Sequence, residues 1–175
     1  MKRRSVPRAV GKAGTSKSKD HKPQIDPDKS WFKLEVRRSR IHRWGVYALE
    51  PIPARRRVIE YTGEKIDDDE VQRRSGSDLI YIFSLDDKWA KDGAVGGSGA
   101  EYINHSCDGN LTSYTYHGRI YLSSNRPIEA GEELTYDYHI TGGDYDLPCK
   151  CGTKKCRGSL REDIKPKRKG KKRRG

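Results

Sequence analysis

The sequence lacks any apolar run long enough for a signal peptide or a membrane helix. A signal peptide needs an apolar stretch of about 7–15 residues, and a membrane helix needs about 20. Apolar residues make up only 32% of the chain, whereas charged residues make up 35%. We therefore expect an intracellular protein without a membrane partner. It would be located in the nucleus of a eukaryote, or in the cytoplasm and nucleoid of a bacterium.

Acidic residues are scarce at both ends of the chain. Residues 1–24 hold eight Lys or Arg against one acidic residue, and residues 161–175 hold nine against two, so each end carries +7. Because the whole chain carries +12, residues 25–160 carry −2. Neither end shows apolar periodicity, so we expect a disordered basic arm at 1–24 and a disordered basic tail at 162–175. These arms could contact the phosphates of a nucleic acid, act as a nuclear address, or simply keep the protein soluble.

Only four cysteines are present, and none of them precedes Cys107. The other three, Cys149, Cys151 and Cys156, lie close together in the sequence. In an intracellular protein, clustered thiols bind metal more often than they form disulfides. Three close thiolates and one distant thiolate would complete a tetrahedral zinc site, which would clamp the C-terminal segment to the strand around Cys107. The alternative is a set of reduced cysteines on the surface.

Apolar residues with helical spacing are also scarce. Residues 66–74 predict a helix, because acidic residues occupy the first turn, where the helix dipole favours them. The loop at 91–100 is rich in glycine, and no Gly-Lys-Ser/Thr sequence follows it, so we expect flexibility rather than phosphate binding. Several other segments show short apolar runs or alternation, with Gly or Pro between them, as β-strands do. The expected strands cover residues 32–36, 46–48, 58–61, 79–85 (a buried strand), 111–117, 119–123 and 133–138.

One short segment combines an amide, an imidazole, a hydroxyl and a thiol, in Asn104, His105, Ser106 and Cys107. An Asp-Gly sequence follows it directly. The simplest interpretation is a strand end that leads into a turn. The same side chains also suit a functional site, and the other motifs of the chain favour that second interpretation.

Six motifs follow one another along the chain. They are Arg-Trp-Gly-Val-Tyr-Ala at 43–48, Glu-Tyr-Thr-Gly-Glu at 60–64, Tyr-Ile-Phe at 81–83, Asn-His-Ser-Cys at 104–107, Glu-Leu-Thr-Tyr-Asp-Tyr at 133–138, and the cysteines at 149, 151 and 156. In this order the sequence resembles the SET-domain lysine methyltransferases with a post-SET zinc motif, over about residues 32–160. Each motif is weak alone, but the six in this order are specific.

The resemblance implies a fold and a domain organisation. It places a SET domain at residues 30–142 and a post-SET zinc motif at residues 145–161. The implied fold is mostly β, a SET-type pseudoknotted fold of several small sheets with little helix, plus a C-terminal zinc knuckle. In this fold the segment ending at Tyr138 passes under the loop around 104–107, which is an exception to the rule that chains do not thread loops.

The resemblance also implies a cofactor, S-adenosyl-L-methionine, on one face of the domain. The backbone of Arg43 and Trp44 would contact it, together with Asn104 and His105. The substrate lysine would enter from the opposite face through a narrow channel. Tyr138 would meet both the cofactor and the lysine.

Three tyrosines are implied as catalytic residues, and one cysteine as a metal ligand. By position, Tyr138 matches the catalytic tyrosine of the family, Tyr136 the residue that sets the number of methyl groups, and Tyr81 a wall of the channel. Cys107 matches the fourth zinc ligand, beside the three C-terminal cysteines.

Lysine methylation needs such a channel. Taking a lysine amine neutral at pH 7 costs about 4–5 kcal/mol in water, because its pKa is about 10.4. An aromatic channel disfavours the charged amine, and tyrosine hydroxyls align the neutral amine without adding charge. We therefore expect an S-adenosylmethionine-dependent protein-lysine N-methyltransferase acting mainly as a monomethylase. Its partner would be a lysine-containing basic protein, such as a histone-like tail.

Two residues depart from the family pattern, and two other functions compete with this one. Arg43 stands where the family often has Gly, and Glu101 stands where it commonly has Arg. The first alternative is a catalytically inactive SET-like module that binds basic peptides. The second is a small zinc-containing nucleic-acid binder, which the basic arms favour and the acidic core does not. We expect a monomer in each case.

Overall fold

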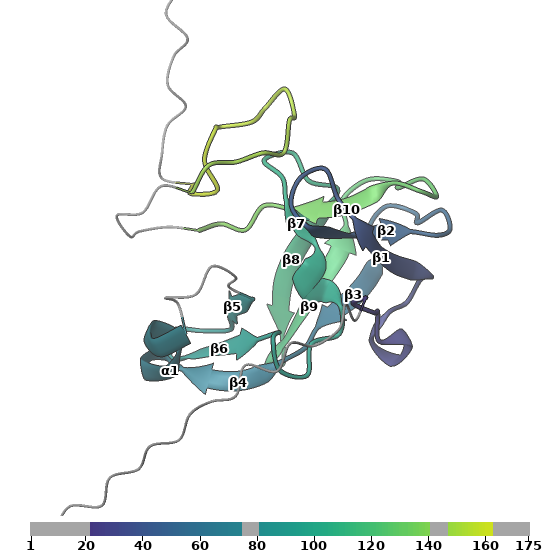
Figure 1. Ribbon diagram of the computed structural model, residues 1–175. Coiled ribbons are helices and arrows are strands. Elements are labelled where there is room, and N and C mark those ends of the chain that lie inside the picture. The colour runs from purple at the N-terminus through teal and green to yellow at the C-terminus, as the bar shows by residue number, and fades with distance from the viewer. Residues whose placement is uncertain (1–21, 75–80, 141–146, 163–175) are drawn as a thin grey trace, which may run out of the picture.

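The computed structural model describes residues 22–74, 81–140 and 147–162 (Figure 1). The expectations for the basic arm and the basic tail therefore fall almost entirely outside the described residues. Within the described ranges, no helix has the length and apolar character needed to cross a membrane. Short strands dominate these ranges, and the expected mostly-β fold of small sheets with little helix is confirmed.

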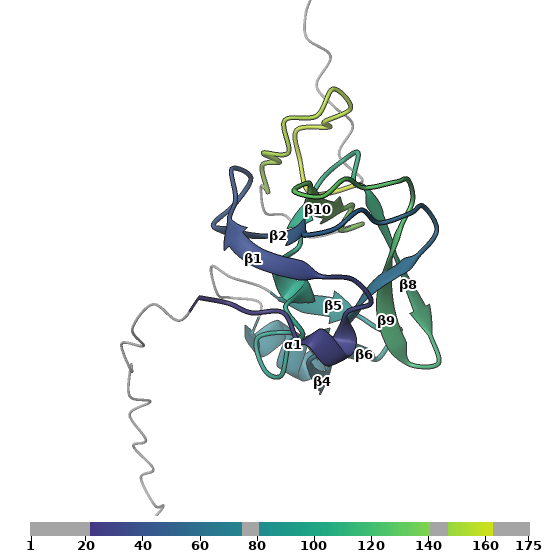
Figure 2. The same cartoon turned by 90° about the vertical axis from the view of Figure 1, so that its right-hand side faces the viewer.

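A seven-stranded sheet and a three-stranded sheet form most of the fold. The larger sheet has the order β1-β2-β10-β8-β9-β3, with β7 paired to β10 beside this path, and the smaller sheet has the order β4-β6-β5. Figures 1 and 2 show the smaller sheet and α1 at one end of the molecule and the segment 147–162 at the other. The elements are η1 Pro27–Lys29, β1 Leu34–Arg38, β2 Trp44–Ala48, β3 Arg57–Tyr61, β4 Glu64–Asp67, α1 Asp68–Arg74, β5 Ile82–Ser84, β6 Trp89–Asp92, η2 Ala100–Tyr102, β7 Asn104–His105, β8 Leu111–Tyr116, β9 Arg119–Ser124 and β10 Glu133–Tyr136.

The core is built from apolar residues of the larger sheet. Val46 of β2 and Leu134 of β10 are fully buried and face each other in register. In β3 every residue from 58 to 61 is buried, although this strand stands last in the sheet order. Its edge is covered by the chain before β1, where the backbone N–H of Trp31 donates to the carbonyl oxygen of Val58 at 2.9 Å. A covered edge is protected from pairing with another chain.

Strand β10 runs between two strands that a single loop connects. Tyr136 pairs with His105 of β7 and also with Leu111 of β8, in parallel register on both sides. The loop from 106 to 110 therefore crosses over β10, and a Cβ added at Gly109 would lie only 2.6 Å from the carbonyl oxygen of Thr135. This close crossing is the threaded arrangement that the SET resemblance implies.

Several element boundaries differ from the expectations, most of them by one or two residues, and three of the differences concern the site described below. The helix begins at Asp68 instead of residue 66, because Ile66 is a buried residue of β4 that pairs with Ala90 of β6. The expected buried strand at 79–85 is, in its described part, the short edge strand β5, which is only half-buried. The last strand ends at Tyr136, so Tyr138 lies just beyond the sheet.

The glycine-rich loop at 91–100 is packed, contrary to the expectation of flexibility. Ser98 is fully buried, and its hydroxyl donates to the carbonyl oxygen of Glu60 at 2.6 Å. Glu101 accepts the backbone N–H of Gly99 at 2.8 Å, and a Cβ added at Gly97 would overlap this carboxylate. Gly97 and Gly99 therefore permit close approach of their neighbours.

Candidate active site and metal centre

Four aromatic rings form a continuous row between the two sheets. Tyr136 and Tyr138 lie with their ring centroids 4.8 Å apart. Phe83 of β5 stacks on Tyr136 with centroids 6.1 Å apart and an interplanar angle of 17°, and Tyr61 of β3 packs against Phe83 at 5.3 Å. Rings at these separations attract one another and shape a wall with few charged groups. Sequence reasoning missed the roles of Tyr61 and Phe83, although both lie in recognised motifs.

Tyr138 is held on three sides. Its hydroxyl donates to the carbonyl oxygen of Ile103 at 2.9 Å, and its backbone N–H donates to Nδ1 of His105 at 3.3 Å. Its ring packs edge-on against the His105 ring, with centroids 5.2 Å apart. Burial raises the pKa of Tyr138 well above its usual value, so the hydroxyl stays neutral at physiological pH.

The Tyr136 side chain is buried, with only 7% of the residue exposed. Burial raises its pKa well above the usual value of 10.0, so this hydroxyl is also neutral. Within the described residues, no hydrogen bond is formed by the Tyr136 hydroxyl. Among the described residues no fully buried side-chain oxygen lacks a partner, so the Tyr136 hydroxyl retains some access to solvent, where a water molecule or a ligand amine can be its partner.

Tyr81 lies at the edge of the same aromatic row. Its carbonyl oxygen accepts the Tyr61 hydroxyl at 2.6 Å, and its ring packs edge-on against Tyr102 at 5.6 Å. Its phenol is close enough to Tyr138 to contribute to the raised pKa of that residue. The structure thus gathers all three tyrosines singled out from the sequence; Tyr136 is buried, and Tyr81 and Tyr138 are partly buried.

Asn104 joins the start of β2 to β10. Its Nδ2 donates to the carbonyl oxygen of Trp44 at 2.8 Å and to Oε1 of Glu133 at 2.9 Å. Among the described residues, nothing donates to its Oδ1, which is therefore available to a ligand. Arg43 adopts a left-handed conformation with φ of 37°, which explains why glycine suits this position. Glu133, which the sequence reasoning missed, also accepts the Ser39 hydroxyl at 2.7 Å.

The His105 side chain connects the cysteine cluster to Tyr138. It is buried, with Nε2 lying 3.3 Å from Sγ of Cys107 and Nδ1 accepting the backbone N–H of Tyr138. Burial lowers the pKa of His105 to about 4, despite the nearby carboxylate of Asp137. A neutral ring with its proton on Nε2 satisfies both contacts. The imidazole is thus engaged within the protein.

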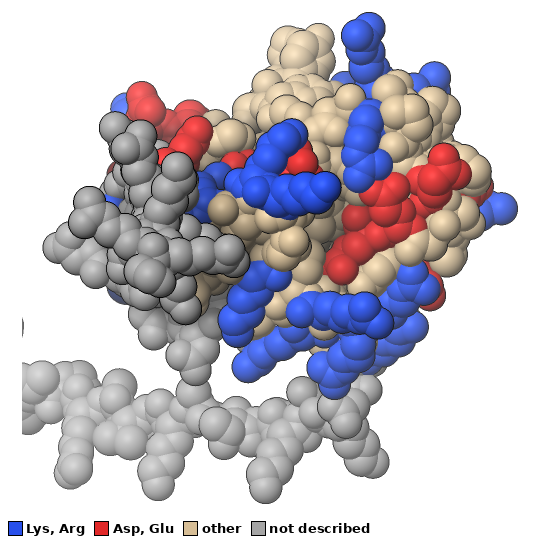
Figure 3. Space-filling view, turned by 90° about the horizontal axis from the view of Figure 1, so that it is seen from above, with Lys and Arg blue, Asp and Glu red and all other residues tan. Residues whose placement is uncertain are grey.

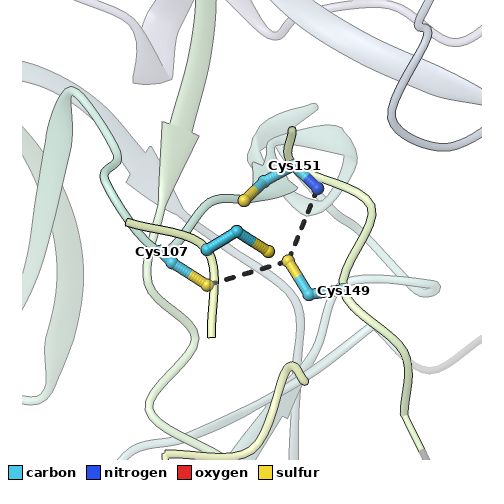
Figure 4. Close-up of side chains that lie close together, drawn as sticks. Cys107, Cys149 and Cys151 are labelled. Atoms are coloured by element: carbon cyan, nitrogen blue, oxygen red, sulfur yellow. Dashed lines mark hydrogen bonds between the residues drawn. The ribbon is translucent and has the colours of Figure 1, made fainter. Parts of the chain in front are cut away.

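The four cysteines form one cluster. Their Sγ atoms all lie within 4.8 Å of one another, and those of Cys107 and Cys149 are 3.7 Å apart. Four sulfurs placed about 2.3 Å from a tetrahedral zinc ion would be about 3.8 Å apart, so the cluster fits this metal. Figure 4 shows the sulfurs of Cys107, Cys149 and Cys151 turned toward one another. The backbone N–H of Arg157 points at Sγ of Cys107, at 3.5 Å, as it would toward a thiolate.

An ion pair joins the cysteine segment to the two tyrosines. Arg157, which directly follows Cys156, donates to both carboxylate oxygens of Asp137, with Nη2 to Oδ1 at 2.8 Å. The guanidinium also donates to the carbonyl oxygens of Leu160 and Arg161, each at 2.8 Å. Burial alone would raise the pKa of Asp137, but Arg157 holds it below its usual range. Sequence reasoning missed this pair, although an acid between two tyrosines was a visible signal.

Glu101 contacts the glycine-rich loop at 91–100. Its carboxylate accepts the N–H of Gly99, and burial raises its pKa. The acid that departs from the family pattern thus has a local structural role.

The described surface carries charge of both signs. Seen from the side of the cysteine segment, acidic side chains gather in a group that Lys and Arg border (Figure 3). This mixture agrees with the small net charge of residues 25–160.

Comparison with known proteins gives a consistent result. The SET domain family matches residues 43–139, which is more than half of the chain. The chain is 40% identical over 138 residues to histone-lysine N-methyltransferase SETD1A of Homo sapiens, covering 73% of this chain and 8% of that protein. It is 39% identical over 136 residues to the H3 lysine-4 specific histone-lysine N-methyltransferase of Saccharomyces cerevisiae, covering 70% of this chain and 13% of that protein.

A third relative is histone-lysine N-methyltransferase set1 of Dictyostelium discoideum, which is 37% identical over 138 residues, covering 73% of this chain and 9% of that protein. The chain thus spans only a small part of the length of the curated relatives it matches. The motifs, the threaded β10 strand and the matched range agree, and the chain belongs to the SET domain family.

Proposed function

We propose that this chain is a protein-lysine N-methyltransferase that uses S-adenosyl-L-methionine. The observation that carries the proposal is the pair of buried Tyr136 and partly buried Tyr138, which lies beside strand β7 with Asn104 and His105. The family match and the names of the relatives support the same reaction.

The proposed site separates a cofactor side from a lysine side. S-adenosylmethionine, when bound, supplies the methyl group as part of a sulfonium cation. We assign its binding to the turn at Arg43 and Trp44, to Asn104 and His105, and to Tyr138. The free Oδ1 of Asn104 suits a donor on the cofactor, and the imidazole of His105 is engaged elsewhere, which leaves its backbone for the cofactor.

The aromatic row would handle the lysine. Rings from β3, β5 and β10 desolvate the side chain and so favour the neutral amine, which carries the lone pair needed for attack. Tyr138 donates its own proton to Ile103, so its oxygen lone pairs remain free to accept a hydrogen bond from the amine. Tyr136 and Tyr81 would border the same channel. The main contribution of these residues is positioning.

We assign zinc to Cys107, Cys149, Cys151 and Cys156. Four protein ligands close the site, which suits a structural ion and leaves no position for a substrate. The ion would fasten the post-SET motif at 145–161 to the SET domain at 30–142. It would do so beside His105, whose other ring nitrogen contacts Tyr138.

The proposed substrate is a lysine in a basic protein, such as a histone-like tail. The relatives are named for histone lysine, and one of them for lysine 4 of histone H3. We propose that the product is mainly monomethyl-lysine, because the Tyr136 hydroxyl would retain a water molecule beside the amine. The basic arms would provide a separate contact with nucleic acid, and the enzyme would act as a monomer.

Calorimetric titration with S-adenosylmethionine, followed by a transfer assay on histone-like tails and ribosomal proteins, tests the proposal. We expect saturable cofactor binding and methyl transfer to lysine. Cofactor binding without transfer to any basic protein would favour an inactive peptide-binding module. No cofactor binding would reject the assignment.

A further inference from the structure

The outer side of strands β8, β9 and β3 carries a group of aromatic and arginine side chains. Tyr114 of β8 faces Tyr121 of β9, and Tyr116 faces Arg119 in the same register. Trp31, which precedes β1, packs edge-on against Tyr121 with centroids 6.0 Å apart. We call this group the aromatic face; it consists of Trp31, Arg57, Tyr114, Tyr116, Arg119 and Tyr121.

Three rings of the aromatic face are exposed, whereas Tyr121 is buried beneath them with 5% of the residue exposed. Trp31 is 51% exposed, Tyr116 is 56% exposed and Tyr114 is 38% exposed. Ile120 and Leu122, which alternate with Tyr121 along β9, are fully buried on the opposite side of the strand. The β8–β9 hairpin lies at one side of the molecule (Figure 2). Large aromatic side chains gathered on one open side of a sheet indicate a binding surface.

Arg57 holds the face in a fixed arrangement. Its guanidinium lies 3.9 Å from the ring centroid of Tyr121 and 5.2 Å from that of Trp31. Its Nε also donates to the Tyr114 hydroxyl at 3.1 Å. Tyr114 and Tyr121 in turn pack with centroids 5.7 Å apart. A preformed surface loses little conformational entropy when a ligand binds.

The charge of the face is positive. Arg57 and Arg119 lie among the rings, and the side chain of Arg119 is 61% exposed. Glu60 is an acidic residue beside them, but it is buried. Its Oε2 lies 3.7 Å from Nη1 of Arg119. Arg55 and Arg56, in the turn that leads into β3, are also exposed. Cations interleaved with aromatic rings complement a ligand that has flat rings and a negatively charged backbone.

We propose that the aromatic face binds single-stranded nucleic acid. Unpaired bases would stack on Trp31, Tyr114 and Tyr116, while the two arginines of the face would contact phosphates. A duplex hides its base faces, so it would gain only the phosphate contacts. This site differs from the proposed contact through the basic arms, because it depends on stacking as well as charge. It is independent of the proposed methyl transfer.

Fluorescence anisotropy of a labelled uridine oligonucleotide of about 12 nucleotides, with the full chain in about 0.2 M salt, tests the proposal. We expect the double variant Trp31→Ala/Tyr116→Ala to bind the oligonucleotide about 10- to 100-fold more weakly than the native chain. The variant Arg119→Glu should show a similar loss of affinity. The matched control is Trp89→Ala, which removes a 38% exposed tryptophan of β6 that lies against Lys65, and it should bind normally.

Two further measurements separate stacking from charge and from misfolding. A self-complementary duplex should bind the double variant and the native chain equally. The rate of methyl transfer to a free peptide should also be equal for the double variant and the native chain. Unchanged affinity of the double variant for the oligonucleotide would overturn the proposal and favour a protein as the partner of the face. An equal loss in Trp89→Ala would overturn it as well, because the effect would not be specific to the face.

Discussion

The hydroxyl of Tyr136 decides how much space a methylated lysine finds. Burial keeps this hydroxyl neutral, and among the described residues it lacks a protein partner, so a water molecule can bind between it and the amine. A methylated amine must displace that water, which costs about 1–3 kcal/mol if its partners stay unsatisfied. The second transfer should thus be about 5- to 150-fold slower than the first.

The substitution Tyr136→Phe should remove this restriction. We expect the variant to keep the first transfer and to gain di- and trimethyl-lysine, which mass spectrometry of a lysine peptide would resolve. Phe83→Tyr is a matched control, because it adds a hydroxyl to the ring stacked on Tyr136 without removing one. Trimethylation by the native chain would show that Tyr136 does not limit the product.

Arg157 links two elements that are distant in the sequence, the cysteine segment and the end of β10. Its guanidinium group donates two hydrogen bonds to the carboxylate of Asp137, which lies between Tyr136 and Tyr138 in the sequence. Arg157→Lys keeps the charge but loses the paired hydrogen bonds, so Tyr138 should be less well positioned. We expect kcat to fall about 10- to 100-fold with one zinc ion still bound per chain.

Arg126→Lys is the matched control for Arg157→Lys. Arg126 also donates to both carboxylate oxygens of an acid, Glu132, but this pair lies ahead of β10 and away from the tyrosines. Its kcat should stay close to that of the native chain. Equal losses in the two variants would mean that Arg157 contributes only to stability.

The cysteine cluster joins the loop after β7, which holds Cys107, to the C-terminal segment 147–162. Cys151→Ser should lower zinc content below one ion per chain, because a hydroxyl is a poor substitute for a thiolate ligand. The segment 147–162 should then become sensitive to protease, and methyl transfer should be lost. Thr153→Ala keeps all four ligands and removes only a side-chain contact to Cys151, so its zinc content should be normal. Full activity in Cys151→Ser would reject the clamp.

The sequence predicted some elements well because their signals are local. Alternation predicted β1, β2 and the β8–β9 hairpin, and the cysteine spacing predicted the cluster. The acidic residues after Ile66 predicted a helix beginning at that residue, yet pairing with Ala90 places Ile66 in a strand. The contact between Asp137 and Arg157 joins residues 20 positions apart across a threaded fold. The position of Asp137 between two tyrosines is visible in the sequence, but no local pattern encodes its pairing with Arg157.

At the scale of the whole molecule, the strongest positive charge lies in the two arms. We expect removal of residues 1–21 and 163–175 to leave cofactor binding and activity on a free peptide unchanged. The cut is placed at residue 21 because the carbonyl oxygen of Gln24 lies against Gly99. Activity on a substrate bound to nucleic acid should fall, since phosphate contacts are lost. Equal losses on both substrates would show that the arms contribute to the folded domain.

Mass spectrometry of basic proteins incubated with S-adenosylmethionine and the chain tests lysine methylation at the tyrosine pair most directly. The native chain should add chiefly one methyl group to a lysine. Tyr138→Phe should bind the cofactor but lose activity about 100-fold or more, because the amine loses the hydroxyl that aligns it. Absence of methylated lysine with the native chain, or full activity of Tyr138→Phe, would contradict the account.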